Sequence, residues 1–180
     1  MTFCYAGSLT RHKGVHLLLD AFRGLKGDGT GLLIYGSGPG EYERRLRALA
    51  GDDGRIRFMG VYAPEDTASV FGGCDVVVIP SVWYENYPLV MHEALMSRVP
   101  VLASGIGGMS EKIKDGWNGN TFRVGDVEDL RQKMRDIVAH PSVLNQYKEN
   151  LSGLLLPTVE QEASRYLKIF EELKLSRERA

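Results

Sequence analysis

The stretch from Val76 to Ser104 constrains the fold more than any other part of the chain. Val76 to Ile79 form a continuous apolar run, which predicts a buried parallel strand that Pro80 ends. A polar, aromatic loop follows, and Pro88 then stands where a helix would place its first residue. Val99 to Ala103 predict a second buried strand. Strand, loop, helix and strand in this order are the repeating unit of a parallel sheet.

The rest of the chain continues this alternation as far as the last strand, and two further helices follow at the C-terminal end. Strands are expected at residues 3–6, 32–35, 56–59, 75–79, 99–103 and 121–124, and helices at 15–25, 41–49, 64–71, 127–139, within 141–155, and at 158–175. Asp126 is the expected N-cap of its helix, and Thr158 with Gln161 predicts a capping box. We therefore expect a Rossmann-like, three-layer α/β/α fold with about six parallel strands. The expected strand order is 3-2-1-4-5-6, with a crevice between strands one and four.

Composition excludes several classes of protein. With 180 residues, 43% of them hydrophobic, the chain has room for one soluble domain with a full core. A net charge of −1 gives no reason to expect binding to nucleic acid or to a membrane surface. Cys4 and Cys74 are interpreted as buried free thiols, which predicts a reducing, cytoplasmic location. Because the first strand starts almost at residue 1, we expect the chain to be a piece of a longer protein.

Glycine-rich loops follow the first two strands. Lys13 lies in a Gly-x5-Lys-Gly sequence at a helix start. A lysine there can reach phosphate oxygens, while the glycines let the backbone approach the phosphate. The alternative is an exposed cation at that position. Gly36-Ser37-Gly38-Pro39 is not a dinucleotide fingerprint, because it follows strand two and lacks the third glycine. A tight turn and a nucleotide contact both stay open for it.

Glu85 and Glu93 make a Glu-x7-Glu pair inside the central stretch. Proline-serine, a loop, Glu-x7-Glu-Ala and a proline-valine strand together resemble the signature of the retaining glycosyltransferases of family 4, among the glycosyl transferases group 1, which have the GT-B fold. Gly107-Gly108-x-x-Glu111 and Asp115-Gly116 resemble further motifs of that family. The resemblance implies that this chain is the C-terminal, donor-binding domain of a two-domain enzyme.

The resemblance also implies roles for individual residues. Glu93 would accept hydrogen bonds from ribose hydroxyls, Glu85 would contact the transferred sugar, and Lys13 would hold the diphosphate, which makes Glu85 and Lys13 the expected catalytic residues. Ser8 stands where the family has arginine, so Arg11 is the candidate for that charge. Tyr62 is expected by the base or in the core. The full expected donor-binding set is Gly7, Ser8, Arg11, Lys13, Tyr62, Glu85, Asn86, Tyr87, Leu89, Val90 and Glu93.

For the whole protein, the resemblance implies a single domain over residues 1–180, with its final helix, about 158–175, packing back toward an N-terminal domain. The donor would be a nucleotide sugar such as a UDP- or GDP-sugar, with no metal and no other cofactor. The acceptor, a glycan, lipid or small molecule, would bind through the N-terminal domain, so the chain alone would be inactive. Peripheral membrane association of the parent enzyme stays open.

Two other classes of function remain as alternatives. One is a non-catalytic nucleotide-binding or interaction module. The other is a glycoside hydrolase that uses two carboxylates, which would require Glu85 and Glu93 to flank one glycosidic bond. His12, His16 and His92 lack ligand spacing with acids or cysteines, so the sequence predicts no metal site.

Overall fold

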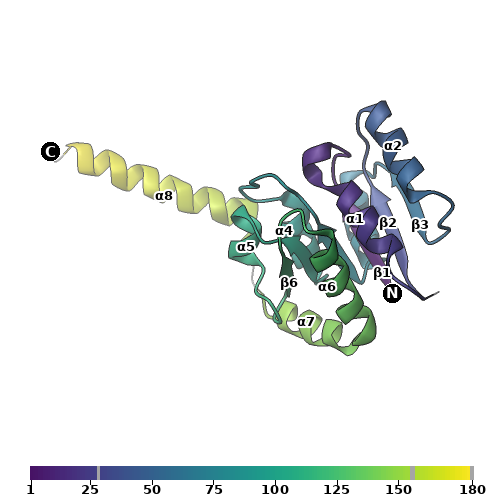
Figure 1. Ribbon diagram of the computed structural model, residues 1–180. Coiled ribbons are helices and arrows are strands. Elements are labelled where there is room, and N and C mark those ends of the chain that lie inside the picture. Colours follow the sequence, from purple (N-terminus) through teal and green to yellow (C-terminus); the bar gives the residue numbers. More distant parts are fainter. Residues whose placement is uncertain (28, 155–156, 179–180) are drawn as a thin grey trace.

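All six strands are parallel and pair in the order β3-β2-β1-β4-β5-β6, which confirms the predicted topology. The computed structural model describes residues 1–27, 29–154 and 157–178. The strands are β1 (Thr2–Ala6), β2 (Gly31–Tyr35), β3 (Ile56–Gly60), β4 (Val76–Ile79), β5 (Val101–Ser104) and β6 (Gly119–Phe122). Helices cover both faces of the sheet (Figure 1). The chain reverses its direction across the sheet between β1 and β4, where the crevice was expected.

The helices follow the strands as the alternation predicted. They are η1 (Arg11–Lys13), α1 (Val15–Arg23), α2 (Gly40–Ala50), η2 (Pro64–Asp66), α3 (Thr67–Gly72), α4 (Leu89–Met96), α5 (Gly107–Lys112), α6 (Val127–Ala139), α7 (Ser142–Ser152) and α8 (Val159–Glu178). The Asp126 side chain accepts a hydrogen bond from the Asp129 N–H, as an N-cap should. Both hydrogen bonds of the capping box form, between the Thr158 N–H and Gln161 Oε1 and between the Gln161 N–H and Thr158 Oγ1.

Several boundaries differ from the predictions. Pro88 is the N-cap of α4 and not its first residue. Val99 is not yet a strand residue, because Arg98 adopts a left-handed φ of 58° and the Val99 N–H bonds to the Ala94 carbonyl, which closes the end of α4. The last strand covers Gly119–Phe122 and so lies earlier than residues 121–124. Helix α7 ends at Ser152, and residue 155 of the predicted range lies outside the described residues.

Alternate residues of the strands belong to two separate hydrophobic cores, one on each face of the sheet. Phe3, Leu32, Val78 and Leu102 face α1 and α6, where they pack with residues such as Phe22. The next residues in the strands, which include Cys4, Leu33, Val77 and Ala103, face α3, α4 and α5. Burial on both faces explains why these strands read as continuous apolar runs.

Cys4 and Cys74 form a disulfide, so the prediction of two free thiols is wrong. The Asp75 N–H donates to the Thr2 carbonyl, and Phe3 pairs with Val76 across the sheet. Cys74 lies in the turn between α3 and β4, and its Cα is 5.8 Å from that of Cys4, a distance that a disulfide can bridge. The two cysteines are 70 residues apart in sequence. With the thiols gone, the cytoplasmic location loses the argument on which it was based and stays a prediction.

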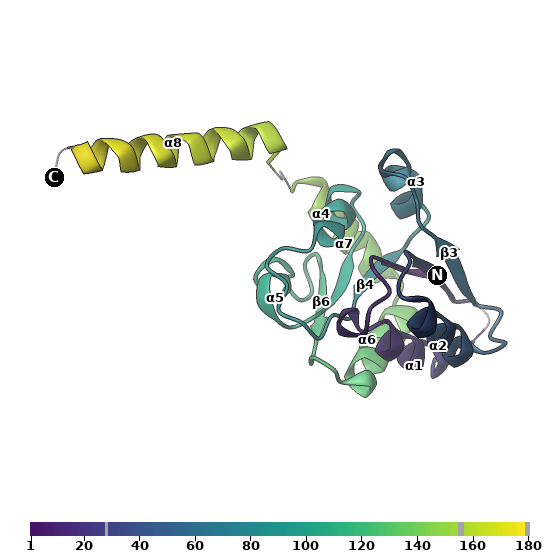
Figure 2. The same cartoon turned by 90° about the horizontal axis from the view of Figure 1, so that it is seen from above.

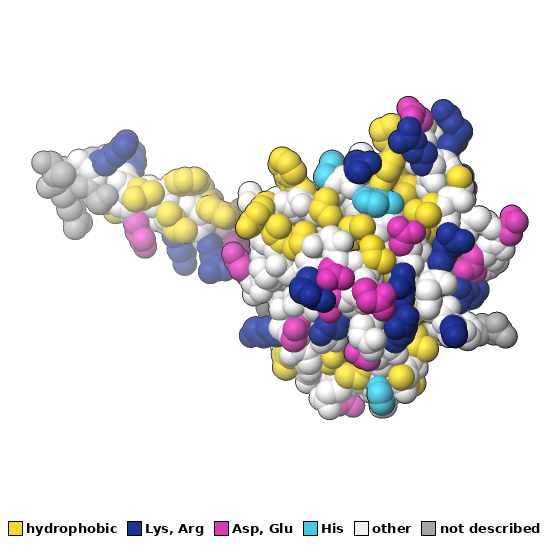
Figure 3. Space-filling view, in the orientation of Figure 1, with side chains coloured by type: hydrophobic (Ala, Val, Ile, Leu, Met, Phe, Trp, Pro, Cys, Tyr) yellow, Lys and Arg dark blue, Asp and Glu magenta, His cyan; other side chains and the backbone are white. Residues whose placement is uncertain are grey.

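Helix α8 extends away from the sheet and its covering helices in two perpendicular views (Figures 1 and 2). Its apolar side chains are more than half exposed at Val159, Tyr166, Leu167, Phe170 and Leu173, and Figure 3 shows hydrophobic side chains along its length. The prediction that this helix packs toward another domain therefore stays untested. Among the helices of the described residues, none has the combination of length and apolarity needed to cross a bilayer.

Candidate functional site

The loops that follow β1 and β4 are in close backbone contact at the crevice. Gly14, between η1 and α1, has a left-handed φ of 72°, and a Cβ placed on it would lie 1.8 Å from the Pro80 carbonyl oxygen. The His12 carbonyl accepts a hydrogen bond from the Val82 N–H at 2.8 Å, and Ser81 Oγ lies 3.2 Å from the same carbonyl oxygen. Only glycine fits such a close approach of two backbones. The position of Lys13 is therefore fixed relative to the loop that carries Glu85.

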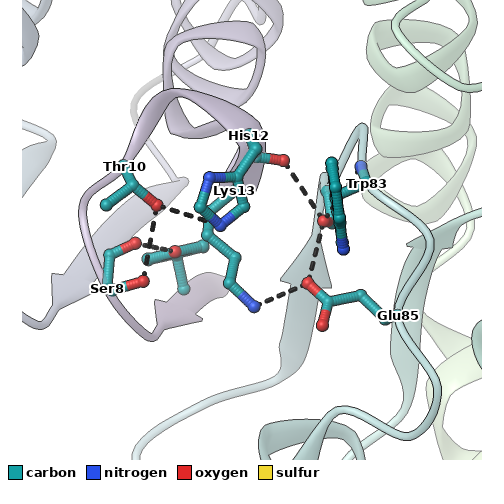
Figure 4. A network of polar contacts seen from close by, with 8 residues as sticks. Ser8, Thr10, His12, Lys13, Trp83 and Glu85 are labelled. Atoms are coloured by element: carbon teal, nitrogen blue, oxygen red, sulfur yellow. Dashed lines mark hydrogen bonds and ion pairs between the residues drawn. The ribbon is translucent and has the colours of Figure 1, made fainter.

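Lys13 and Glu85 form an ion pair inside this interlocked region (Figure 4). The Lys13 Nζ lies 2.6 Å from Glu85 Oε1, and the side chains are 28% and 15% exposed. Ser81, which is fully buried, donates a second hydrogen bond to the same carboxylate oxygen at 3.0 Å. The structure thus brings together the two residues that were predicted to be catalytic.

The glycine-rich loop after β5 is the third loop that contacts this region. The Gly108 N–H donates to the Glu85 carbonyl at 2.8 Å. A Cβ on Gly108 would lie 1.8 Å from the Asn86 carbonyl oxygen, so this loop rests directly on the backbone of the Glu85 loop. Three loops from distant parts of the chain thus meet at one place.

A pocket of about 390 Å³ opens at the carboxyl ends of β1, β2 and β3, partly in the loop that also carries Lys13. Its lining is Gly7, Ser8, Gly36, Ser37, Val61, Tyr62, Pro64, Thr67 and Glu93. The Tyr62 ring packs edge-on against Tyr35, with ring centroids 5.6 Å apart. Burial raises the pKa of the Tyr62 phenol, and the nearby charge of Glu93 raises it further. The pocket therefore combines an aromatic wall, two glycine-rich turns and one carboxylate.

The glycines of the second loop support this pocket by close packing. A Cβ on Gly36 would lie 1.8 Å from the Gly7 carbonyl oxygen, and a Cβ on Gly38 would lie 2.0 Å from that of Leu9. The Leu9 N–H donates to the Ser37 carbonyl at 2.8 Å. Gly36 and Gly38 therefore make close backbone approaches, and Gly36 and Ser37 line the pocket. Contact of these residues with a nucleotide stays a prediction.

Other predicted residues lie around this centre and not in the pocket lining. Arg11 is exposed in η1, where its charge adds to burial in lowering the pKa of His16. The Tyr87 hydroxyl contacts His92 Nδ1 at 2.9 Å. Leu89 is 75% exposed at the start of α4, and Val90 packs against the core on the α4 face. Direct roles for these four residues in donor binding stay predictions.

Sequence reasoning missed the residues that hold the site in place. Ser81 was read as part of a motif, and its bond to Glu85 depends on a loop whose path the sequence does not show. The Tyr5 hydroxyl donates to the Ser8 carbonyl at 2.7 Å beneath the first loop. Burial raises the pKa of Tyr5, and the Glu85 charge adds to this effect. The alternation of side chains along β1 indicated that Tyr5 faces the core. The hydrogen bond of its hydroxyl to the Ser8 carbonyl was not predictable.

Within residues 1–27, 29–154 and 157–178, no group of three His, Cys, Asp or Glu side chains is arranged to hold a metal ion. The charged side chains described at the crevice are those of Lys13, Glu85 and Glu93. The expectation that the site works without a metal stays a prediction.

A parallel sheet covered by helices on both faces, with polar loops at the β1/β4 switch point, defines the class of Rossmann-like α/β domains. Within that class, residues 1–152 match the glycosyl transferases group 1, and the chain belongs to this family. A curated relative, the phosphatidyl-myo-inositol mannosyltransferase of Mycobacterium leprae, is 30% identical over 138 residues, which cover 75% of this chain and 36% of that protein.

Solved glycosyltransferase structures share the fold. The sucrose-phosphate synthase of Thermosynechococcus elongatus is 26% identical, with a TM-score of 0.81 over 97% of this chain and 46% of that chain. Anabaena HepE in complex with UDP and glucose is 23% identical, with a TM-score of 0.77 over 83% of this chain and 42% of that chain. The chain thus spans less than half of each of these three proteins.

Proposed function

We propose that this chain is the donor-binding domain of a retaining, metal-independent glycosyltransferase that transfers a sugar from a nucleotide sugar to an acceptor. The observation that carries the proposal is that the loop after β1 supplies both Gly7 and Ser8 of the Glu93 pocket and Lys13 of the Lys13–Glu85 ion pair. In this arrangement the nucleoside occupies the pocket and the diphosphate extends toward Lys13. The sugar then reaches Glu85.

Each of these groups suits its proposed partner. A carboxylate accepts both ribose hydroxyl protons, which is the task of Glu93. The Tyr62 ring offers an apolar wall for a base. Lys13 places a positive charge where the negative charge of the leaving diphosphate develops during transfer. The presence of UDP in the Anabaena HepE structure supports a uridine nucleotide as the first donor to test.

The two-carboxylate hydrolase is the weaker alternative. Glu93 lines the pocket, whereas Glu85 lies outside its lining and is held by Lys13 and Ser81. A glycosidase needs two carboxyl groups on either side of one bond, with one of them free to transfer a proton.

A non-catalytic nucleotide-binding module is the second candidate. We propose that the chain alone binds the donor and transfers nothing, since closure against a second domain normally positions both reactants. Steady transfer of sugar by the 180-residue chain to a mixture of acceptors would contradict that part of the proposal.

The binding site is tested by titrating the chain with UDP-, GDP- and ADP-glucose, using ligand-detected NMR or calorimetry. We expect a dissociation constant on the order of 0.1 to 1 mM for the preferred nucleotide, as for a half-open site. Glu93→Gln should weaken binding about tenfold or more, because charge-assisted hydrogen bonds contribute roughly 1.5–3 kcal/mol. No binding of any of the three nucleotides refutes the proposed function.

Lys13 is tested by comparing a nucleoside with its diphosphate. Lys13→Ala should weaken UDP binding at least tenfold and leave uridine binding within about twofold, because a charged hydrogen bond to phosphate is lost. The same comparison applies to guanosine or adenosine if GDP or ADP proves to be the preferred nucleotide. Equal losses for the nucleoside and the diphosphate would remove Lys13 from the phosphate site.

A further inference from the structure

The positive charge of Lys13 is paired with the negative charge of the Glu85 carboxylate. The Lys13 Nζ lies 2.6 Å from Glu85 Oε1, and both side chains are mostly buried. A diphosphate that approaches Lys13 therefore meets the Glu85 carboxylate at close range. At such distances, and with little solvent between the charges, repulsion between two negative groups is strong.

The Glu85 carboxylate is held where it is. Ser81 donates to Oε1 at 3.0 Å and is itself fully buried. The backbone of Glu85 is anchored by the Gly108 N–H, which donates to its carbonyl at 2.8 Å. Because Ser81 of the same loop contacts the carboxylate and α5 fixes the backbone beneath it, the carboxylate does not swing away freely when a ligand enters.

Two ligands of the proposed site differ in the group that would face this carboxylate. The terminal phosphate of a free nucleoside diphosphate is attached only through its anhydride bond and carries close to two negative charges near pH 7. In a nucleotide sugar the same phosphate is also esterified to the sugar and carries one charge, and the sugar presents hydroxyl groups that donate to a carboxylate.

We propose that Glu85, held by Lys13 and Ser81, makes the site select the sugar-carrying nucleotide over the free nucleoside diphosphate that transfer leaves behind. The inference rests on the proposed function and adds a role in substrate selection and product release. Glu85 repels the doubly charged terminal phosphate and occupies the cation that this phosphate needs. The same carboxylate accepts hydrogen bonds from the sugar, so donor and product are affected in opposite directions.

The experiment measures the affinities of UDP and UDP-glucose for the wild-type chain, Glu85→Gln and Glu85→Ala by calorimetric titration, with GDP or ADP pairs if the wild type prefers those bases. We expect both variants to bind UDP about five- to twentyfold more tightly than the wild type, since Lys13 is released and a negative charge is removed. UDP-glucose binding should stay level or weaken. The ratio of the two affinities should therefore move toward UDP by at least tenfold.

Two matched controls separate this effect from others. Glu93→Gln should weaken UDP and UDP-glucose by the same factor, because Glu93 lines the nucleoside pocket. Glu149→Gln removes one negative charge near the amino ends of β4 and β5, at the other end of the sheet, and should change neither affinity. Urea denaturation of each variant checks that the chain is still folded.

The outcomes are distinguishable. If a nucleotide binds and both Glu85 variants lose UDP and UDP-glucose in equal proportion, the selection role is wrong while the proposed function stands. If UDP binding is unchanged in both variants, the ion pair does not limit Lys13 and the inference is also overturned. If no nucleotide binds the wild type, the proposed function fails, and the inference fails with it.

Discussion

The sheet with its covering helices and helix α8 use apolar residues in opposite ways. In the sheet domain, residues 1–154, large side chains such as Phe22 are fully buried against the strands. In α8, Phe170 is 62% exposed and Leu167 is 60% exposed. Tertiary packing therefore stabilises the sheet domain, whereas α8 depends on its own capping and backbone hydrogen bonds. The same substitution should have different consequences in the two regions.

The largest difference is expected for one phenylalanine removed from each region. Phe22→Ala leaves a cavity in the core and should lower the free energy of unfolding by about 3–5 kcal/mol. Phe170→Ala removes an exposed side chain and should change it by about 0.5 kcal/mol or less. Urea denaturation followed by the fluorescence of Trp83 and Trp117, both in the sheet domain, measures the two effects. Similar losses would show that α8 packs on the sheet domain in solution.

The disulfide should give the next largest effect, again only in the sheet domain. The double variant Cys4→Ser, Cys74→Ser should lose about 2–4 kcal/mol, because the bond restricts a long loop of the unfolded chain. The same loss should follow treatment of the wild type with a reductant that opens the bond. A chain shortened to residues 1–157 serves as the control and should lose as much. An unchanged urea midpoint after complete reduction would contradict this expectation.

A smaller effect, confined to α8, is expected from its cap. Thr158→Ala removes the side chain that accepts from the Gln161 N–H and should destabilise the first turn by about 1 kcal/mol. Amide hydrogen exchange should become faster in the first turns of α8 and stay unchanged in β1 and β4. Thr67→Ala in α3 is the control for a threonine whose hydroxyl bonds to the Pro64 carbonyl. Slower exchange, or equal changes in both regions, would argue against independent α8 formation.

The smallest effect concerns acid and the loop before β3. Hydrogen bonds from Arg55 lower the pKa of Asp53, and Arg55 also donates to the Leu25 carbonyl. Because the folded-state pKa lies below the unfolded value of about 3.9, this contribution is present above that value and is lost as pH falls below it. Asp53→Asn should therefore flatten the decline in stability between about pH 5 and pH 3. Removing residues 158–180 should leave that decline unchanged.

Local signals in the sequence predicted most of the fold. The apolar runs at Val76–Ile79 and Val101–Ser104 are buried on both faces, which is the condition that produces such runs. The two caps, at Asp126 and Thr158, depend on residues three positions apart and were predicted without knowledge of the fold. Helix and strand ends were less predictable. For example, α4 ends in a backbone turn at Arg98 and Val99, and no side chain in the sequence indicates that turn.

The candidate site divides in the same manner. Lys13, Glu85 and Glu93 were found from motif spacing, and the parallel topology was enough to bring their loops together. The supporting bonds of Ser81 and Tyr5 were not predictable, because each depends on the path of a loop in space. The disulfide was missed for the same reason, since one cysteine lies in β1 and the other in the turn before β4, and these two segments meet only in the folded chain.

The bond between Cys4 and Cys74 also makes a covalent ring of the chain from β1 to the end of α3. A protease that cuts once within residues 5–73, for example in the turn before β2, opens this ring without separating the two pieces. On a gel such a nicked chain would run at full mass until a reductant is added. A cut at residues 153–158 has no such link across it and releases α8 at once. The order in which fragments appear with and without reductant would therefore trace the path of the chain through the first half of the sheet.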